Sequence, residues 1–392
     1  MLSFHLRATS ASPVRAPGRT ATRPLRVAHL TTSDMSLALL LATELTVDLE
    51  AGHDVVGISA PGRYVERVEA LGVRHVPVPS LSRSWGLKAD IRGFAELVRV
   101  LRRLDLDVLH THNPKTGVMG RIAGRACGIP VVVNTCHGLW ARPGDPLKRR
   151  VFVYGLEGVA SRFSDYELFQ NAEDQHTLRF ALRRGRSRVV GNGIDLERFQ
   201  PDPEGRARVR AELGVGDDEI LVGAVGRRVV EKGEREFVAM SSALAGRARF
   251  VWIGPDDGEL HDADDGAVEF VGERRDMTAV YSALDVFVLA SYREGFSRAG
   301  MEAAACGRPM VLTDIRGCRE VGTSEEHLLL VPSADAAALT EAVARLIEDP
   351  ALRTRLGDAA RERALAEFDQ RRVAATSLTT YASVAAEKDL GW

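Results

Sequence analysis

The chain of 392 residues is poor in cysteine and lysine and contains no long apolar run. Its four cysteines, Cys127, Cys136, Cys306 and Cys318, form no CxxC pair, so neither a disulfide framework nor structural zinc is expected. No apolar stretch approaches the roughly 18 residues that span a bilayer, so the sequence predicts no transmembrane helix. Lysine accounts for only 5 of the 52 basic residues, which is typical of a GC-rich genome and makes each remaining lysine more informative.

A strong charge of one sign and the common nucleotide-binding motifs are also missing. The net charge is -2 with 27% charged residues, so bulk electrostatics indicates no nucleic-acid partner. The P-loop pattern G-x-x-x-x-G-K-[ST] is absent, and no G-x-G-x-x-G follows an expected strand, which argues against a nicotinamide enzyme. The expected class is an ordinary globular protein of about two domains.

From Leu25 onward, short apolar runs alternate with amphipathic helices, which is typical of parallel βαβ layers. We expect an α/β protein with two Rossmann-like, doubly wound domains that face a central cleft. A polar stretch with Pro201, Pro203 and Gly205 separates the two series of strands. The predicted boundaries are a leader over 1–24, a first domain over 25–198, a second domain over 199–368, and a C-terminal helix over 369–392 that returns to the first domain.

The leader contains Arg7, Arg15, Arg19 and Arg23 and no acidic residue, a composition shared by transit peptides and disordered tails. A disordered extension, or a start codon assigned too far upstream, is the favoured interpretation. The expected location of the protein is the cytoplasm.

Polar side chains follow several of the expected strands, and ligands bind at the carboxyl ends of the strands in open parallel sheets. His112 and Asn113 follow "DVLHT", and His137 follows "VVVNTC". In the second domain, Arg227 and Lys232 follow "EILVGAVG" in a glycine-bounded turn where two cations and backbone amides would hold a diphosphate.

The segment "REGFSRAGMEAAACGRPMVLTD" (293–314) predicts a loop carrying Glu294 and a helix carrying Glu302. Ser297 is the expected N-cap and Gly307 the expected C-terminal stop. Free amides near Ser297 and Arg298 would favour a phosphate, whereas a carboxylate cannot bind a phosphate, so the glutamates are expected to accept hydrogen bonds from hydroxyl groups. Together these groups indicate a nucleotide-sugar site.

Two patterns resemble metal-binding motifs, but their positions favour other roles. Asp105-Leu106-Asp107 precedes a strand and lies at its amino end, away from the expected cleft, so it is interpreted as a turn. His110 and His112 are expected on opposite faces of a strand, as core or acceptor contacts. No metal and no other cofactor is predicted.

In combination, four stretches resemble the GT-B glycosyltransferases, specifically the retaining enzymes of family 4 that build bacterial surface polysaccharides. They are "DVLHTHNPKTGVMGRIAGRACGIPVVVNTCHG", "GNGIDLERF", "VGRRVVEKG" and "REGFSRAGMEAAACGRPMVLTDIRGCREV". The resemblance covers nearly the whole chain after residue 25. It implies that the second domain binds a nucleoside diphosphate sugar and that the first domain binds a sugar, lipid-linked or small-molecule acceptor.

The resemblance also implies roles for individual residues. Arg227 and Lys232 would neutralise the diphosphate, Glu302 would bind the ribose, Glu294 would bind the transferred sugar, and His137 would contact that sugar from the other domain. Further residues implied at the donor are Gly226, Phe296, Ser297 and Arg298, and those implied at the acceptor are His112, Asn113 and Lys115. The loop "TTSDMS" (31–36) replaces the glycine pair of many relatives, and Ser297-Arg298 replaces their Gly-Leu.

Two other functions fit the same architecture, a nucleotide-sugar 2-epimerase and a non-catalytic sugar-nucleotide-binding protein. The turn "EKG" followed by "EGFSRAGME" favours the transferase over the epimerase, and the complete set of site groups argues against the non-catalytic protein. Peripheral contact with the inner face of a membrane is a further hypothesis, because Lys148, Arg149 and Arg150 precede the apolar "VFVYGLEGV".

Overall fold

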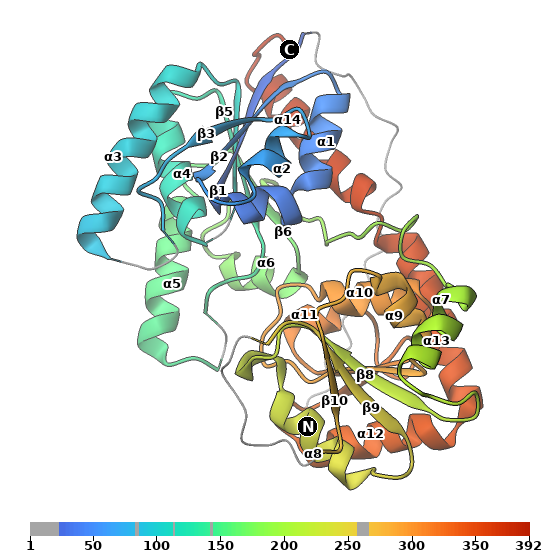
Figure 1. Cartoon of the computed structure of the whole chain (residues 1–392). Helices are drawn as coiled ribbons and strands as arrows, with labels where there is room; N and C mark the ends of the chain where they lie inside the picture. The colour runs from blue at the N-terminus through green and yellow to red at the C-terminus, as the bar shows by residue number, and fades with distance from the viewer. Residues whose placement is uncertain (1–22, 83–85, 113, 142–143, 257–265) are drawn as a thin grey trace.

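The computed structural model describes residues 23–82, 86–112, 114–141, 144–256 and 266–392, which form two lobes (Figure 1). The predicted leader therefore lies almost entirely outside the described residues. Each lobe contains one parallel sheet covered by helices on both faces, which confirms the two Rossmann-like domains expected from the alternating pattern.

The N-lobe contains a seven-stranded sheet in the order β3-β2-β1-β4-β5-β6-β7. Its strands are β1 (Arg26–Ser33), β2 (Asp54–Ala60), β3 (Arg74–Pro77), β4 (Val108–His112), β5 (Val131–Cys136), β6 (Tyr166–Phe169) and β7 (Ser187–Val189). Its helices are η1 (Ser36–Leu40), α1 (Ala42–Glu50), α2 (Val65–Glu69), α3 (Leu87–Leu104), α4 (Pro114–Ala126), α5 (Leu147–Ala160) and α6 (Ala172–Leu178).

The C-lobe contains a six-stranded sheet in the order β10-β9-β8-β11-β12-β13. Its strands are β8 (Leu221–Val225), β9 (Arg249–Ile253), β10 (Glu269–Gly272), β11 (Val286–Leu289), β12 (Met310–Thr313) and β13 (Leu329–Val331). Its helices are α7 (Pro203–Glu212), η2 (Val230–Lys232), α8 (Glu234–Ala243), α9 (Met277–Ala283), α10 (Arg298–Ala305), α11 (Arg316–Arg319), α12 (Ala336–Glu348) and α13 (Pro350–Glu367).

The last helix, α14 (Gln370–Glu387), packs on the N-lobe sheet although it follows the C-lobe in sequence. Successive residues of a strand point to opposite faces, so Ala28 and Leu30 pack with α3 and α4, while Val27 faces the other way. Tyr381 and Val384 of α14 cover that second face. The helix also packs against α1.

Two local features differ from the sequence interpretation. The segment "LALLLATELTVDLEAG" (37–52), whose pattern predicts a single helix ended by glycine, is divided at Leu41 into the π-helical turn η1 and the helix α1. The strand β3 and the helix α2 were not predicted, because each is five residues or shorter and shows no clear periodicity.

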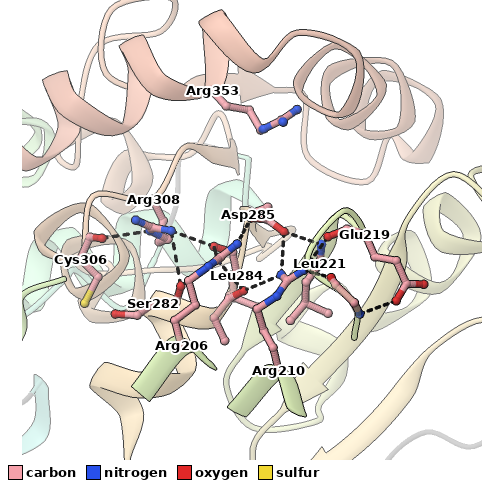
Figure 2. A network of polar contacts seen from close by, with 12 residues as sticks. Arg206, Arg210, Glu219, Leu221, Ser282, Leu284, Asp285, Cys306, Arg308 and Arg353 are labelled. Atoms are coloured by element: carbon pink, nitrogen blue, oxygen red, sulfur yellow. Dashed lines mark hydrogen bonds and ion pairs between the residues drawn. The ribbon is translucent and has the colours of Figure 1, made fainter. Parts of the chain in front are cut away.

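A network of arginines fastens α7 to the amino end of the C-lobe sheet (Figure 2). Arg206 and Arg210 of α7 both bond to the carboxylate of Asp285, at 2.7 and 2.9 Å, and the amide of Leu221 donates to the same carboxylate at 2.8 Å. Arg308 donates to the carbonyl of Leu284 at 3.0 Å. Because these groups precede β8, β11 and β12, they lie at the opposite end of the sheet from the predicted ligand site. Their role is to stabilise the packing of α7 against the sheet.

Candidate active site

The two lobes meet where the carboxyl ends of both sheets face each other (Figure 1). Arg316 of α11 donates to the carboxylate of Asp174 at 2.5 Å and to the carbonyl of Leu139 at 2.6 Å in the other lobe. Gly138 and Gly295 touch so closely that a Cβ on Gly295 would lie 2.2 Å from the carbonyl oxygen of His137. The loops after β5 and β11 are therefore in direct contact.

Lys232 and Glu294 form an ion pair at the carboxyl end of the C-lobe sheet. The Nζ of Lys232 lies 2.6 Å from Oε1 of Glu294, and the hydroxyl of Ser291 donates to the same oxygen at 2.8 Å. Gly233 makes this approach feasible, because it has a φ of 72° and a Cβ there would lie 2.1 Å from the carbonyl oxygen of Ala290. Lys232 and Glu294, two predicted site residues that lie 62 positions apart in the sequence, are thus in direct contact.

The turn after β8 presents two arginines in different environments. Arg227 is exposed, and a Cβ on Gly226 would lie 3.6 Å from Cε of Lys232, at ordinary contact distance. Arg228 is buried, with its Nε 2.5 Å from Oε1 of Glu234 and its guanidinium 3.7 Å from the ring centroid of Phe270. Arg227 is thus the arginine of this turn that solvent reaches, while Arg228 holds the turn against the sheet.

Glu302 lies on α10, one turn after the helix begins. The hydroxyl of Tyr281 donates to its Oε2 at 2.8 Å, and Arg298 lies 3.8 Å from its other oxygen. Burial raises the pKa of Glu302, and the charge of Arg298 and the hydrogen bond from Tyr281 oppose that rise. The carboxylate is held in place while retaining capacity to accept a further hydrogen bond from a hydroxyl group.

The start of α10 agrees with the sequence interpretation in one respect and corrects it in another. Ser297 caps the helix, its hydroxyl accepting from the amide of Gly300 at 3.0 Å, and Gly307 has a φ of 69° just beyond the end. The amide of Ser297 is not free, however, because it donates to the carbonyl of Gly317 at 3.1 Å. Phe296 packs against Phe368 in the C-lobe core.

His137 lies at the end of β5 and lines a cavity of about 350 Å³ between the lobes, together with Gln170, Asn192 and Arg298. Its Nε2 is 3.0 Å from Nδ1 of His112, and its buried Nδ1 has no hydrogen-bond partner among the described residues. Burial lowers the pKa of His137 to about 4, although the side chain of Gln170 favours the protonated ring through a hydrogen bond. The ring is therefore neutral at pH 7.

Glu294 lines a second cavity of about 420 Å³, with Arg316 and Arg319. His137 and Glu294 therefore line different cavities. The structure places the two residues next to the contact between Gly138 and Gly295, one on each lobe.

The prediction that His110 and His112 point to opposite faces of β4 is wrong. Residues two apart on a strand share a face, and the two ring centroids are 4.2 Å apart. His110 bonds to the hydroxyls of Tyr381 and Thr135, at 2.6 and 2.7 Å. His112 lies between His29 and His137.

The four residues His29, Glu44, His110 and His112 bring ligand-type atoms within 4.8 Å of one another, the spacing of a potential metal site. Each ring nitrogen of these histidines already has a protein hydrogen-bond partner, namely Asp48, His112, Tyr381, Thr135, His29 or His137. Because the nitrogens are satisfied by protein groups, we assign the cluster to hydrogen bonding.

The remaining candidates are distributed as follows. Lys115 is buried on α4 in an ion pair with Asp90, and Asn113 lies outside the described residues. Asp105 is the C-cap of α3 with a φ of 47°, and Asp107 accepts from the amide of Arg26 at 2.9 Å. The Asp-Leu-Asp segment is thus part of a turn, as its position before β4 indicated.

Sequence reasoning missed two residues of this region, His29 and Asp48. Each is fully buried, and the two side chains bond at 2.7 Å. The available signal was a histidine inside the apolar run "LRVAHLT" and an aspartate on the buried side of a helix. A buried polar group needs a hydrogen-bond partner, so each of these two residues was a signal that a partner such as the other existed.

Two facing parallel sheets, with cations, carboxylates and a neutral histidine at their carboxyl ends, define a two-lobed α/β enzyme with its site between the lobes. Comparison with known proteins gives the family. Residues 219–349 match "Glycosyl transferases group 1", and residues 37–193 match "Glycosyl transferase 4-like domain".

Among curated relatives, UDP-Gal:alpha-D-GlcNAc-diphosphoundecaprenol alpha-1,3-galactosyltransferase of Escherichia coli is 30% identical over 71% of this chain and 76% of its own length. A second relative, N,N'-diacetylbacillosaminyl-diphospho-undecaprenol alpha-1,3-N-acetylgalactosaminyltransferase of Campylobacter jejuni, is 27% identical over 85% of this chain and 92% of its own length. Among solved structures, Anabaena HepE in complex with UDP has a TM-score of 0.79 at 19% identity, covering 92% of this chain and all of that one.

The chain belongs to the family 4 glycosyltransferases of the GT-B fold. It is a glycosyltransferase of polysaccharide or glycoconjugate biosynthesis. In the part of the chain that the structure covers, no helix is both long and apolar enough to cross a membrane.

Proposed function

We propose that the protein transfers a sugar from a nucleoside diphosphate sugar to an acceptor hydroxyl with retention of anomeric configuration. The observation that supports this proposal is the ion pair between Lys232 and Glu294, whose Nζ and Oε1 lie 2.6 Å apart near the lobe contact. In the proposed reaction the cation serves the diphosphate and the carboxylate serves sugar hydroxyls. The relative whose name includes UDP-Gal, and the neighbour solved with UDP, support a nucleoside diphosphate as the leaving group.

In this reaction Lys232 and the exposed Arg227 neutralise the charge that develops on the departing diphosphate. Such preorganised cations typically contribute a factor of about 10² to 10³ in rate. Glu302 accepts from ribose hydroxyls, for which Tyr281 and Arg298 hold it in position. Glu294 accepts from hydroxyls of the transferred sugar.

His137 contacts the transferred sugar from the N-lobe. The carbonyl of His137 already lies against Gly295, the residue after Glu294, so a sugar between the two side chains requires the lobes to separate at this contact. With the acceptor on the same face as the leaving group, a phosphate oxygen takes the acceptor proton, and no protein nucleophile is needed. Metal is not part of the proposed mechanism.

A lipid-linked acceptor at a membrane surface fits the outer face of α5. Leu147, Val151 and Phe152 are 69%, 64% and 57% exposed, and Lys148, Arg149 and Arg150 lie among them. At the start of α3, Leu87 and Ile91 are also exposed, and α3 and α5 both pack against α4 (Figure 1). Apolar side chains beside basic ones are typical of helices that bind anionic bilayers.

The experiment is a thermal-shift screen of nucleoside diphosphates and their sugars, followed by transfer assays with the stabilising donor and NMR of the product's anomeric proton. We expect selective stabilisation by one nucleotide and a product with the donor's configuration. An inverted product would refute retention, and epimerised donor without acceptor would identify an epimerase instead. Stabilisation by no nucleotide would overturn the proposal.

A further inference from the structure

Three buried side chains and the half-buried His137 form a continuous hydrogen-bonded chain from α1 to the lobe contact. Oδ2 of Asp48 is 2.7 Å from Nε2 of His29, and Nδ1 of His29 is 3.1 Å from Nε2 of His112. Nδ1 of His112 is 3.0 Å from Nε2 of His137. Asp48, His29 and His112 have no exposed surface, and the chain ends at the unpartnered Nδ1 of His137 beside the cavity.

The direction of this chain follows from the chemistry of its first member. An ionised carboxylate only accepts hydrogen bonds, so Nε2 of His29 carries the proton. A neutral imidazole has one donor and one acceptor nitrogen, so Nδ1 of His29 accepts from Nε2–H of His112. By the same rule Nδ1 of His112 accepts from Nε2–H of His137, which leaves Nδ1 of His137 as the acceptor nitrogen of that ring.

We propose that Asp48, His29 and His112 are positioning residues that hold His137 in its Nε2–H tautomer, so that Nδ1 accepts a hydrogen bond from a hydroxyl of the transferred sugar. This inference rests on the proposed function for the identity of the hydroxyl. The tautomer itself depends only on the chain of four residues. Without this hydrogen-bonded chain, His137 would populate both tautomers, so that its Nδ1 would be a donor in some molecules and an acceptor in others. The sugar would then be bound less tightly.

The charges around the chain keep its members in the required states. Burial lowers the pKa of His112 and His137, so both rings are neutral. Burial also lowers the pKa of His29, but the hydrogen bond to Asp48 and the charges of Asp48 and Glu44 outweigh it and raise the pKa overall. The groups facing His29 are Asp48 and Glu44 of α1 and His110 and His112 of β4.

An added proton would therefore settle on His29 and reverse the chain. His29 would then donate through Nδ1 to His112, His112 through Nδ1 to His137, and Nδ1 of His137 would become a donor. The acceptor form is the state above the pKa of His29, which lies above 6.5. For that reason the test is made at an alkaline pH at which the ¹⁵N signals of His29 are those of a neutral ring.

The test is ¹⁵N NMR of the histidine rings over a pH series that extends until the His29 ring is neutral, with the signals of His137 assigned by their loss in His137→Gln. In the wild-type protein we expect a protonated Nε2 and an unprotonated Nδ1 on His137. A protonated Nδ1 there would overturn the proposal even if every variant failed to fold. Asp48→Asn should shift His137 toward the other tautomer, and an unchanged tautomer in a folded variant would also overturn it.

His110→Gln is the matched control, because His110 is equally buried on the same face of β4 but lies outside the chain. Asp48→Asn should raise KM for the nucleotide sugar about tenfold while leaving the affinity for the nucleoside diphosphate unchanged, whereas the control should leave the tautomer of His137 unchanged. If His110→Gln changed the tautomer of His137 as much as Asp48→Asn does, the change would reflect altered packing around β4, and the proposed role of Asp48 would be wrong.

Two further measurements separate this proposal from its alternatives. Stoichiometric zinc in the purified protein that is lost in His29→Gln would show that His29, His110 and His112 bind metal. This result would overturn the proposed hydrogen-bonded chain. Failure to bind any nucleoside diphosphate would overturn the proposed function. The NMR measurement would still show, independently of that function, whether the chain of four residues fixes the tautomer of His137.

Discussion

Lys232 and Glu294 contact each other at 2.6 Å although they come from turns after different strands, β8 and β11. These strands are neighbours in the C-lobe sheet, so their carboxyl ends bring the two side chains together. The side chain of Lys232 is 23% exposed and that of Glu294 is 13% exposed. A partly desolvated cation is the stronger electrostatic partner for a diphosphate.

Removing this cation should therefore affect catalysis more than folding. We expect Lys232→Ala to lower kcat/KM for transfer by about 10²- to 10³-fold with little change in the unfolding temperature. Arg247→Ala is the control, because Arg247 lies before β9, at the opposite end of the same sheet, in an exposed ion pair with Glu348. Near-normal turnover of Lys232→Ala would exclude Lys232 from the site.

The contact between the lobes predicts a difference between two neighbouring arginines. Arg316 and its partner Asp174 are buried, with side-chain exposures of 7% and 1%, so Arg316→Ala leaves a buried carboxylate unpaired. We expect a loss of about 3 to 5 kcal/mol in the free energy of unfolding, measured by urea denaturation. Arg319 pairs with Glu173 across the same contact at 47% and 35% exposure, and Arg319→Ala should cost less than about 1 kcal/mol. Equal effects would contradict this assignment.

Acidification should destabilise the protein through its buried neutral histidines. The pKa of His137 is about 4 in the folded state and ordinarily about 6.5, so between these values the unfolded chain binds a proton that the folded chain does not. Stability therefore falls as the pH falls through this window, by roughly 2 kcal/mol from His137 at pH 5.

Thermal unfolding at pH 7.5 and pH 5 measures this loss, and His137→Gln should reduce it. The pKa of His110 and His112 is also lowered by burial, so part of the loss should persist in the variant. A wild-type protein equally stable at both values would show that these rings are protonated when folded.

The exposed face of α5 predicts binding to anionic membranes. The double substitution Val151→Glu and Phe152→Glu should lower the fraction that sediments with phosphatidylglycerol vesicles at low salt by about tenfold. Leu365→Glu is a matched control, since Leu365 is 50% exposed on α13 of the other lobe. If the wild-type protein does not bind these vesicles, α5 has no membrane role.

The sequence alone determined the class of fold and the local structure of the segment with two glutamates. Alternating apolar runs and amphipathic helices require parallel layers, and Ser297 and Gly307 mark a helix by hydrogen-bonding and φ preferences that act within a few residues. Fold class and helix ends were predictable because the forces that set them are local.

Only the tertiary structure decided which distant groups meet. The pairing of Lys232 with Glu294 depends on the order of strands in the sheet, and the chain from Asp48 to His137 depends on how α1, β1, β4 and β5 pack. Whether an amide such as that of Ser297 is free depends on Gly317, twenty residues away in the sequence. These contacts arise from the packing of whole elements, which residue spacing along the chain does not specify.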